Sequence, residues 1–101
     1  MYKLIAIYKQ PENMDSFESH YQEVHAPLAK KIPGLKEIRL NRMTGTPRGE
    51  SDLHLIAELC FETKDDFKAA MKSEENMACG KDLMNFAKGI VSVYFAEETT
   101  A

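Results

Sequence analysis

Two histidines five residues apart, His20 and His25, have the residue type best suited to acid–base chemistry, because imidazole titrates near neutral pH. They lie in "HYQEVHAPL", where Pro27 cannot donate a backbone hydrogen bond to the carbonyl of Glu23. We therefore expect the helix to kink or end near His25, and the free carbonyls there favour a protonated ring. The alternative, which the spacing alone favours, is a structural histidine that fixes the following turn.

A metal site is not expected at this pair. At about 100° per residue, His20 and His25 are about 140° apart around a helix axis, so they cannot chelate one ion as an i, i+4 pair would. Cys60 and Cys79 are the only cysteines and are far apart, so they are expected to be reduced, small hydrophobic residues. The prediction is that the protein has no metal ligands and no cofactor.

Other polar residues give weaker signals. His54 and Glu58 are expected on one face of a strand, about 13 Å apart at the usual rise per residue, which is too far for a direct hydrogen bond. Asp82 and Asn85, in "GKDLMNFAKG", are expected on a solvated helix face, with a pocket as the alternative.

The positioning elements follow from hydrophobic periodicity and capping signals. One helix is expected after a cap at Asn13 or Asp15, and others after caps at Thr63 and Ser73, with Gly80 a break or a close-packing point. The apolar stripe of the first helix comprises Met14, Phe17, Tyr21, Val24 and Leu28. The predicted strands are residues 2–9, 35–43, 53–62 and 90–96.

This order predicts one α+β domain over residues 1–101 with a ferredoxin-like β-α-β-β-α-β plan and a four-stranded antiparallel sheet. The first and last strands are apolar on both faces, whereas the two helices can cover only one face. We therefore predict a homodimer that pairs through the uncovered sheet face.

Composition narrows the partners further. The net charge is −3 and the basic residues are scattered, which argues against a nucleic-acid-binding surface. No apolar run approaches the roughly 20 residues of a membrane span, and the N-terminus lacks the apolar segment of a signal peptide. We expect a cytoplasmic protein with no membrane partner.

Nearly the full length of the chain resembles the EthD family of the dimeric α/β-barrel superfamily. The specific signal is "HYxxxHxPLxxxxPGL", which runs from His20 to Leu35 across the predicted helix-to-strand connection. The resemblance implies the same ferredoxin-like protomer and a dimer whose two sheets form a barrel with the helices outside. The family is named after a protein encoded with a monooxygenase system, and relatives in the superfamily include cofactor-free monooxygenases, cyclases and isomerases.

Three functions remain open at this point. The first is a small cofactor-independent enzyme that moves a proton on a hydrophobic small molecule, with His25 as the acid–base group, Tyr21 orienting an oxygen and His20 beside them. The second is a non-catalytic dimeric module that binds an apolar ligand or assists a catabolic monooxygenase; haem binding through a histidine is a third option. The expected apolar wall of the site consists of Phe17, Met84 and Phe86.

Overall fold

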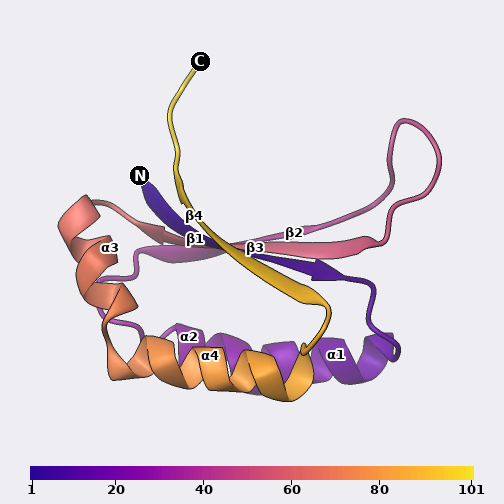
Figure 1. The fold of residues 1–101 in the computed structure, drawn as a ribbon, viewed down its shortest axis with the longest axis horizontal. Helices are drawn as coiled ribbons and strands as arrows, with labels where there is room; N and C mark the ends of the chain where they lie inside the picture. The colour runs from indigo at the N-terminus through magenta and orange to yellow at the C-terminus, as the bar shows by residue number, and fades with distance from the viewer.

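The sheet has four antiparallel strands in the order β2-β3-β1-β4, and all helices lie on one of its faces (Figure 1). This is the arrangement in a computed structural model that describes residues 1–101. The strands are β1 (Tyr2–Lys9), β2 (Glu37–Arg42), β3 (Leu53–Phe61) and β4 (Val91–Glu97). The predicted α+β ferredoxin-like plan is confirmed, and no strand end differs from the prediction by more than two residues.

The helices begin where the sequence provides a cap. The side chains of Asn13, Thr63 and Ser73 each accept a hydrogen bond from the backbone N–H three residues later. The helical segments are α1 (Met14–His20), a π-helical turn η1 (Tyr21–His25), α2 (Ala26–Ala29), α3 (Lys64–Met71) and α4 (Glu74–Phe86). The helix α4 runs without interruption through Gly80, so the predicted break there is wrong. None of these helices has the length and apolarity needed to cross a membrane.

The predicted helix end near His25 is also wrong, because the chain widens into the π-helical turn instead of stopping. In this turn the backbone N–H of Ala26 donates to the carbonyl of Tyr21, five residues earlier, and the helix then continues as α2. Pro27 falls in the first turn of α2, where a missing N–H is tolerated best. Single π turns inside α-helices are uncommon and are frequent at functional sites.

The extra residue in this turn changes which side chains face the sheet. Tyr21, His25 and Ala29 are buried, whereas Val24 is exposed. A regular helix was the basis for placing Val24 in the apolar stripe, and the wider turn rotates it outward. The helix therefore contributes a histidine to the interior at a position where the apolar pattern predicted valine.

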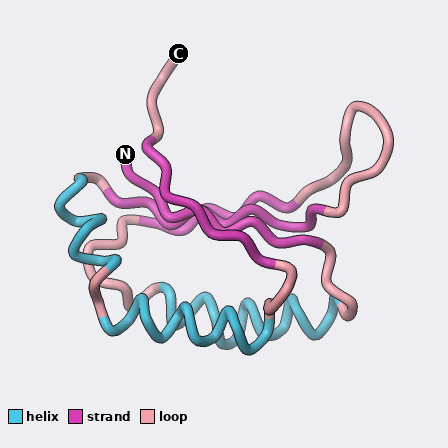
Figure 2. The backbone as a smooth tube through the Cα atoms, viewed as in Figure 1, coloured by secondary structure: helices cyan, strands magenta, loops and turns pink.

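Figure 2 shows the sheet and the helices as separate layers. The interior between these layers contains two packed groups of side chains. The first, called the tyrosine cluster here, consists of Ala6, Tyr8, Phe17, Tyr21, Leu55, Ala57 and Ala87. The second, called the Phe61 cluster, consists of Ala29, Ile32, Leu59, Phe61, Ala70 and Cys79.

The opposite face of the sheet carries no helix. Because side chains alternate along a strand, Ile5, Ile7 and Ile56 point to this face, where they are half-buried. Lys3, on the same face, forms ion pairs of 2.8 Å with both Glu58 and Glu98. The uncovered face is therefore an isoleucine strip that ends at a charged network.

Candidate functional site

The carboxylate of Asp82 holds both histidines. Nε2 of His20 lies 2.8 Å from Oδ1 of Asp82, and Nδ1 of His25 lies 2.9 Å from Oδ2. The Asp82 side chain is 9% exposed, so its expected place on a solvated helix face is wrong. Asp82 comes from α4, 57 residues after His25, and helix periodicity within either segment does not indicate the pairing.

The π-helical turn explains how one carboxylate reaches two imidazoles. In a regular α-helix, positions 20 and 25 would point about 140° apart. With five residues taken up in the widened turn, His20 and His25 come to the same side of the helix and face α4. The expectation that these histidines point about 140° apart around the helix is therefore wrong.

Burial and the shared carboxylate determine the protonation of the group. Burial would raise the pKa of Asp82, but hydrogen bonds from His20 and His25 outweigh it and hold the pKa below its ordinary value. Burial lowers the pKa of His25 below its ordinary value, and this outweighs the opposing effect of Asp82. The expected preference of His25 for the charged form is wrong, because the ring is buried instead of lying at a free helix end.

His25 and Tyr21 line a partly open cavity of about 240 Å³ between the sheet and α4, called the inner cavity here. Tyr8 reaches the same cavity from β1, and its hydroxyl is the one buried side-chain polar atom with no hydrogen-bond partner in the structure. Burial raises the pKa of Tyr21 to about 12, so this phenol stays protonated at neutral pH. The complete lining of this inner cavity is Leu4, Ala6, Tyr8, Tyr21, His25, Ala29, Ala57, Leu59, Met71, Asn76, Cys79, Gly80, Leu83, Val93 and Phe95.

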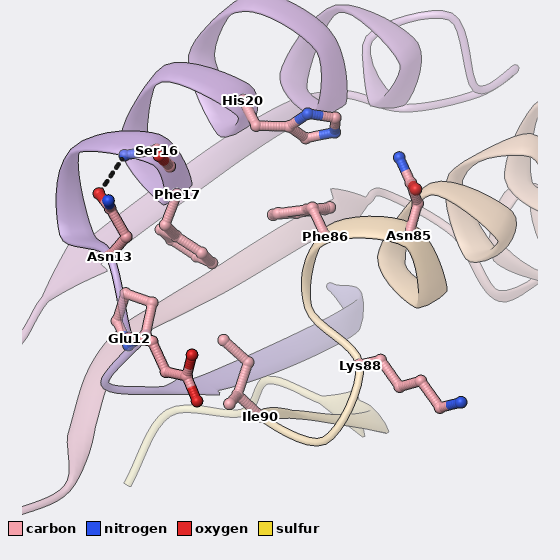
Figure 3. A pocket seen from close by; sticks show the side chains of 10 residues that line it. Glu12, Asn13, Ser16, Phe17, His20, Asn85, Phe86, Lys88 and Ile90 are labelled. Carbon is pink, nitrogen blue, oxygen red and sulfur yellow. Dashed lines mark hydrogen bonds between the residues drawn. The ribbon is translucent and has the colours of Figure 1, made fainter.

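His20 faces a different, more open hollow of about 570 Å³, which is drawn in Figure 3. Its wall contains Phe17 and Phe86 together with polar and charged side chains such as Glu12 and Lys88. The group formed by His20, Asp82 and His25 thus lies between the mostly apolar inner cavity and the more open hollow, whose lining is mostly polar.

The three residues expected as an apolar wall have different positions. The ring of Phe86 packs against His20 at 4.5 Å and against His25 at 5.1 Å between centroids, so it supports both imidazoles. Phe17 and Phe86 line the open hollow, not the inner cavity. Met84 is 55% exposed and lines neither, because the neighbouring Leu83 takes the inward position on α4.

His54 is not part of the group formed by His20, Asp82 and His25. Lys9 pairs with Leu53 whereas Tyr8 pairs with Leu55, so His54 is an extra residue in the strand pairing. Such a bulge redirects a side chain. The imidazole of His54 lies 3.2 Å from the carboxylate of Glu18 on α1, so the prediction that it shares a face with Glu58 is wrong.

Two further observations concern metal and thiol chemistry. The structure contains no group of three or more His, Cys, Asp or Glu side chains arranged to hold a metal ion. Cys60 and Cys79 are both free and buried. Cys79 lines the inner cavity, and burial raises the pKa of its thiol to about 11, which keeps it in the unreactive protonated form.

The fold and site define a ferredoxin-like α+β domain with a hydrogen-bonded His20–Asp82–His25 group beside a mostly apolar cavity. Residues 9–90 match the model of the EthD domain, so the chain belongs to the EthD family. An uncharacterized 11.0 kDa protein in the thcB-thcC intergenic region of Rhodococcus erythropolis is 30% identical over 99% of this chain and 97% of its own length. The crystal structure of an EthD family protein from Bacillus halodurans C-125 is 41% identical, with a TM-score of 0.91 over 98% of this chain and 99% of that chain.

More distant solved structures share the fold. The cofactor-independent oxygenase SnoaB from Streptomyces nogalater is 16% identical, with a TM-score of 0.62 over 97% of this chain and 94% of that chain. A protein from Jannaschia sp. CCS1, described as a dimeric ferredoxin-like protein of unknown function, is 17% identical, with a TM-score of 0.65 over 97% of this chain and all of that chain. At these identities the similarity shows the fold alone.

Proposed function

We propose that this EthD-family protein is a small cofactor-independent enzyme that moves a proton on a hydrophobic small molecule. His25 is the proposed acid–base residue. The observation that carries the proposal is that His25 uses Nδ1 to bind Asp82 while its ring lines the inner cavity. The fold that this chain shares with a cofactor-independent oxygenase is consistent with a role in small-molecule catabolism.

The hydrogen bond to Asp82 gives His25 a defined proton arrangement. An ionised carboxylate only accepts hydrogen bonds, so Nδ1 carries the proton and Nε2 keeps its lone pair. Nε2 makes no hydrogen bond within the protein and is free to accept a proton from a bound molecule. Because burial lowers the pKa of His25, the ring is neutral and ready to act as a base at neutral pH.

The remaining site residues have supporting roles in the proposal. Tyr21 is a protonated phenol that lines the same cavity and can donate a hydrogen bond to a ligand oxygen. His20 and Phe86 hold the acid–base group in place, His20 through the shared carboxylate and Phe86 by packing on both rings. Phe17 and Phe86 line the open hollow and do not contact a ligand in the inner cavity. The proposed apolar contacts to the ligand come from side chains such as Leu59 and Leu83.

A carbonyl compound illustrates the proposed step. Nε2 of His25 takes a proton from the carbon next to the carbonyl group, and the electron pair of that C–H bond forms a C=C bond as the negative charge moves to the carbonyl oxygen. A tyrosine hydroxyl stabilises this oxygen by donating a hydrogen bond. His25 then returns the proton to the same carbon or to another atom of the ligand, so the step needs no outside oxidant or reductant.

The test uses 2-tetralone, a neutral bicyclic ketone, in D₂O. Exchange of its α-protons for deuterium is followed by ¹H NMR with the protein and with buffer alone. We expect the wild-type protein to accelerate exchange, and His25→Gln to lose at least about a hundredfold of the acceleration, the usual size of an acid–base contribution. Tyr21→Phe should lose a smaller part.

The matched control is His54→Gln, which changes a histidine that lines neither the inner cavity nor the open hollow. It should leave exchange unchanged. If 2-tetralone binds in the inner cavity without faster exchange, the protein is a ligand-binding or accessory module and the enzymatic proposal is wrong. If exchange is accelerated equally in His25→Gln, the assignment of His25 is wrong.

We also propose that two copies pair through the uncovered sheet face. The support is the isoleucine strip of Ile5, Ile7 and Ile56, which no helix covers, together with the exposed ring of Tyr94 beside it. A solved structure with this fold is described as dimeric. Pairing would remove this apolar strip from water.

Sedimentation velocity at micromolar concentration tests the pairing. We expect a species of twice the 11.5 kDa chain mass, and Ile7→Lys should convert it to monomer. The control Val24→Lys introduces the same charge at an exposed position on the helix layer and should leave the dimer intact. A monomeric wild-type protein would overturn this part of the proposal.

A further inference from the structure

The hydroxyl of Tyr8 is unusual because nothing in the protein satisfies it. Tyr8 is 0% exposed, and its ring packs edge-on against Phe17 at 5.3 Å and against Tyr21 at 5.9 Å between centroids. Buried side-chain polar atoms almost always have a hydrogen-bond partner, since leaving one without a partner destabilises the fold. A phenylalanine would provide the same packing without this cost, so the oxygen needs another explanation.

The cavity that Tyr8 lines explains why this residue carries a hydroxyl. Burial raises the pKa of Tyr8 above its ordinary value, mainly by disfavouring the charged form, so the hydroxyl keeps its proton and can donate it in a hydrogen bond. Besides Tyr8, only Tyr21, His25, Asn76 and Cys79 bring polar side-chain atoms to the lining. The hydroxyl is therefore a donor with no acceptor, in a space that is otherwise mostly apolar.

The charge of this lining restricts the ligand. No Lys, Arg, Asp or Glu lines the inner cavity. A carboxylate or phosphate would enter without a cationic partner and would lose its hydration, which is strongly unfavourable in an apolar site. The volume of about 240 Å³ is also below the roughly 300–1,000 Å³ typical of sites for drug-sized ligands.

We propose that Tyr8 is the specificity-determining residue of the inner cavity and that it donates a hydrogen bond to the carbonyl oxygen of a compact, neutral, mostly apolar ligand. The choice of a carbonyl group rests on the proposed function, because a carbonyl oxygen that accepts this bond makes the neighbouring C–H more acidic toward His25. The requirement for a neutral ligand with an acceptor oxygen rests on the lining and the unpaired hydroxyl alone.

The experiment compares three ligands by NMR titration of the full-length protein. These are 2-tetralone, tetralin, which has the same ring skeleton without the oxygen, and the anion 2-naphthoate. With the wild-type protein we expect 2-tetralone to bind about tenfold more tightly than tetralin, a factor typical of one hydrogen bond, and 2-naphthoate to bind at least tenfold more weakly than the ketone.

In Tyr8→Phe the advantage of 2-tetralone over tetralin should fall below about threefold, while tetralin binding is unchanged. The melting temperature of this variant should stay the same or rise, because the unsatisfied oxygen has been removed. Equal binding of ketone and hydrocarbon by the wild type, an unchanged ratio in Tyr8→Phe, or preferred binding of 2-naphthoate would each overturn the proposal.

A second measurement does not depend on the variant folding well. The infrared C=O stretch of 2-tetralone bound to the wild-type protein should shift to lower frequency than in hexane, as expected for a hydrogen-bonded carbonyl; an unshifted band would overturn the proposal. The outcomes also separate the two proposals. If binding depends on Tyr8 but deuterium exchange is not accelerated, the proposed ligand contact is supported and the proposed enzyme activity is wrong. If exchange is accelerated equally in Tyr8→Phe, the proposed activity is supported and the proposed role of Tyr8 is wrong.

Discussion

The two halves of the interior differ in what their buried atoms do. In the tyrosine cluster, Tyr8 and Tyr21 bring hydroxyls into the interior next to a histidine, and the Tyr8 hydroxyl has no partner. In the Phe61 cluster, buried Phe61 packs against apolar neighbours such as Ala70 and Ile32, and no side-chain polar atom is unsatisfied. The tyrosine cluster thus keeps polar atoms available, whereas the Phe61 cluster has none unsatisfied and adds only Ala29, Leu59 and Cys79 to the cavity lining.

This difference indicates that different buried residues determine the stability of the fold and the proposed ligand binding. Buried polar atoms lower stability when they lack partners, so a fold that retains them needs a well-packed region elsewhere. The Phe61 cluster provides such a region at the opposite end of the helix layer. A change at Phe61, which does not line the inner cavity, should alter folding without altering ligand binding, whereas Tyr8→Phe should alter binding without lowering stability.

The largest effect on stability should come from Phe61→Ala. Removing this fully buried ring leaves a cavity in a closely packed region, which costs about 3–5 kcal/mol in the free energy of unfolding. Urea denaturation measures this cost. At a temperature where the variant is folded, its affinity for 2-tetralone should equal that of the wild type, and a large loss of affinity would contradict the separation of the two regions.

Asp82→Asn should have the next largest effect. The change removes the negative acceptor shared by His20 and His25, and hydrogen bonds to charged groups contribute about 1.5–3 kcal/mol to stability. The pKa of His25 should fall further, because Asp82 raises it in the wild type. Denaturation and NMR titration of the imidazole measure the two effects; Asp65→Asn, an exposed carboxylate on α3, is the matched control and should change neither.

The pH dependence of stability should identify the buried imidazole. The pKa of His25 is lower in the folded protein than in the unfolded chain, so at pH values between the two pKa values the unfolded chain binds more protons. The free energy of unfolding should therefore decrease as the pH falls below about 6.5, the ordinary pKa of histidine. The decrease should become smaller in His25→Gln, and an identical pH profile in that variant would show that another group is responsible.

The smallest effect should come from Gly80→Ala. A Cβ added at Gly80 would meet no atom within 4 Å, so the change brings only the higher helix propensity of alanine, worth about 1 kcal/mol. Because Gly80 lines the inner cavity, the added methyl group should also weaken 2-tetralone binding slightly. A less stable protein would indicate that this part of α4 is packed more tightly than the structure shows.

The sequence was sufficient to predict most of the fold. Alternating apolar residues identify the strands, and the caps at Asn13, Thr63 and Ser73 identify where helices begin, because both signals are local. The ends of β2 were harder to predict, because charged side chains lie between the apolar side chains of this strand. The π-helical turn was missed because the proline signal is equally compatible with a helix that ends.

The site was only partly predictable. The pattern around His20 and His25 indicated the correct helix, whereas Asp82 depends on packing between α1 and α4 and was assigned to solvent. One signal was available, because Asp82 lies three residues after Cys79 and four before Phe86, which is the spacing of an inward-facing helix position. Tyr8 gave no sequence signal, because its strand is apolar on both faces and no sequence pattern reveals that a buried hydroxyl lacks a partner.

The π-helical turn at Tyr21–His25 makes the protein sensitive to chain length at this point. Removing one residue between these positions would restore a regular helix and rotate all that follows by about 100° relative to α1. The imidazole of His25 would then leave the carboxylate that it shares with His20, even if every other side chain were retained. The spacing between the two histidines therefore matters in addition to the identity of Tyr21, which lies between them.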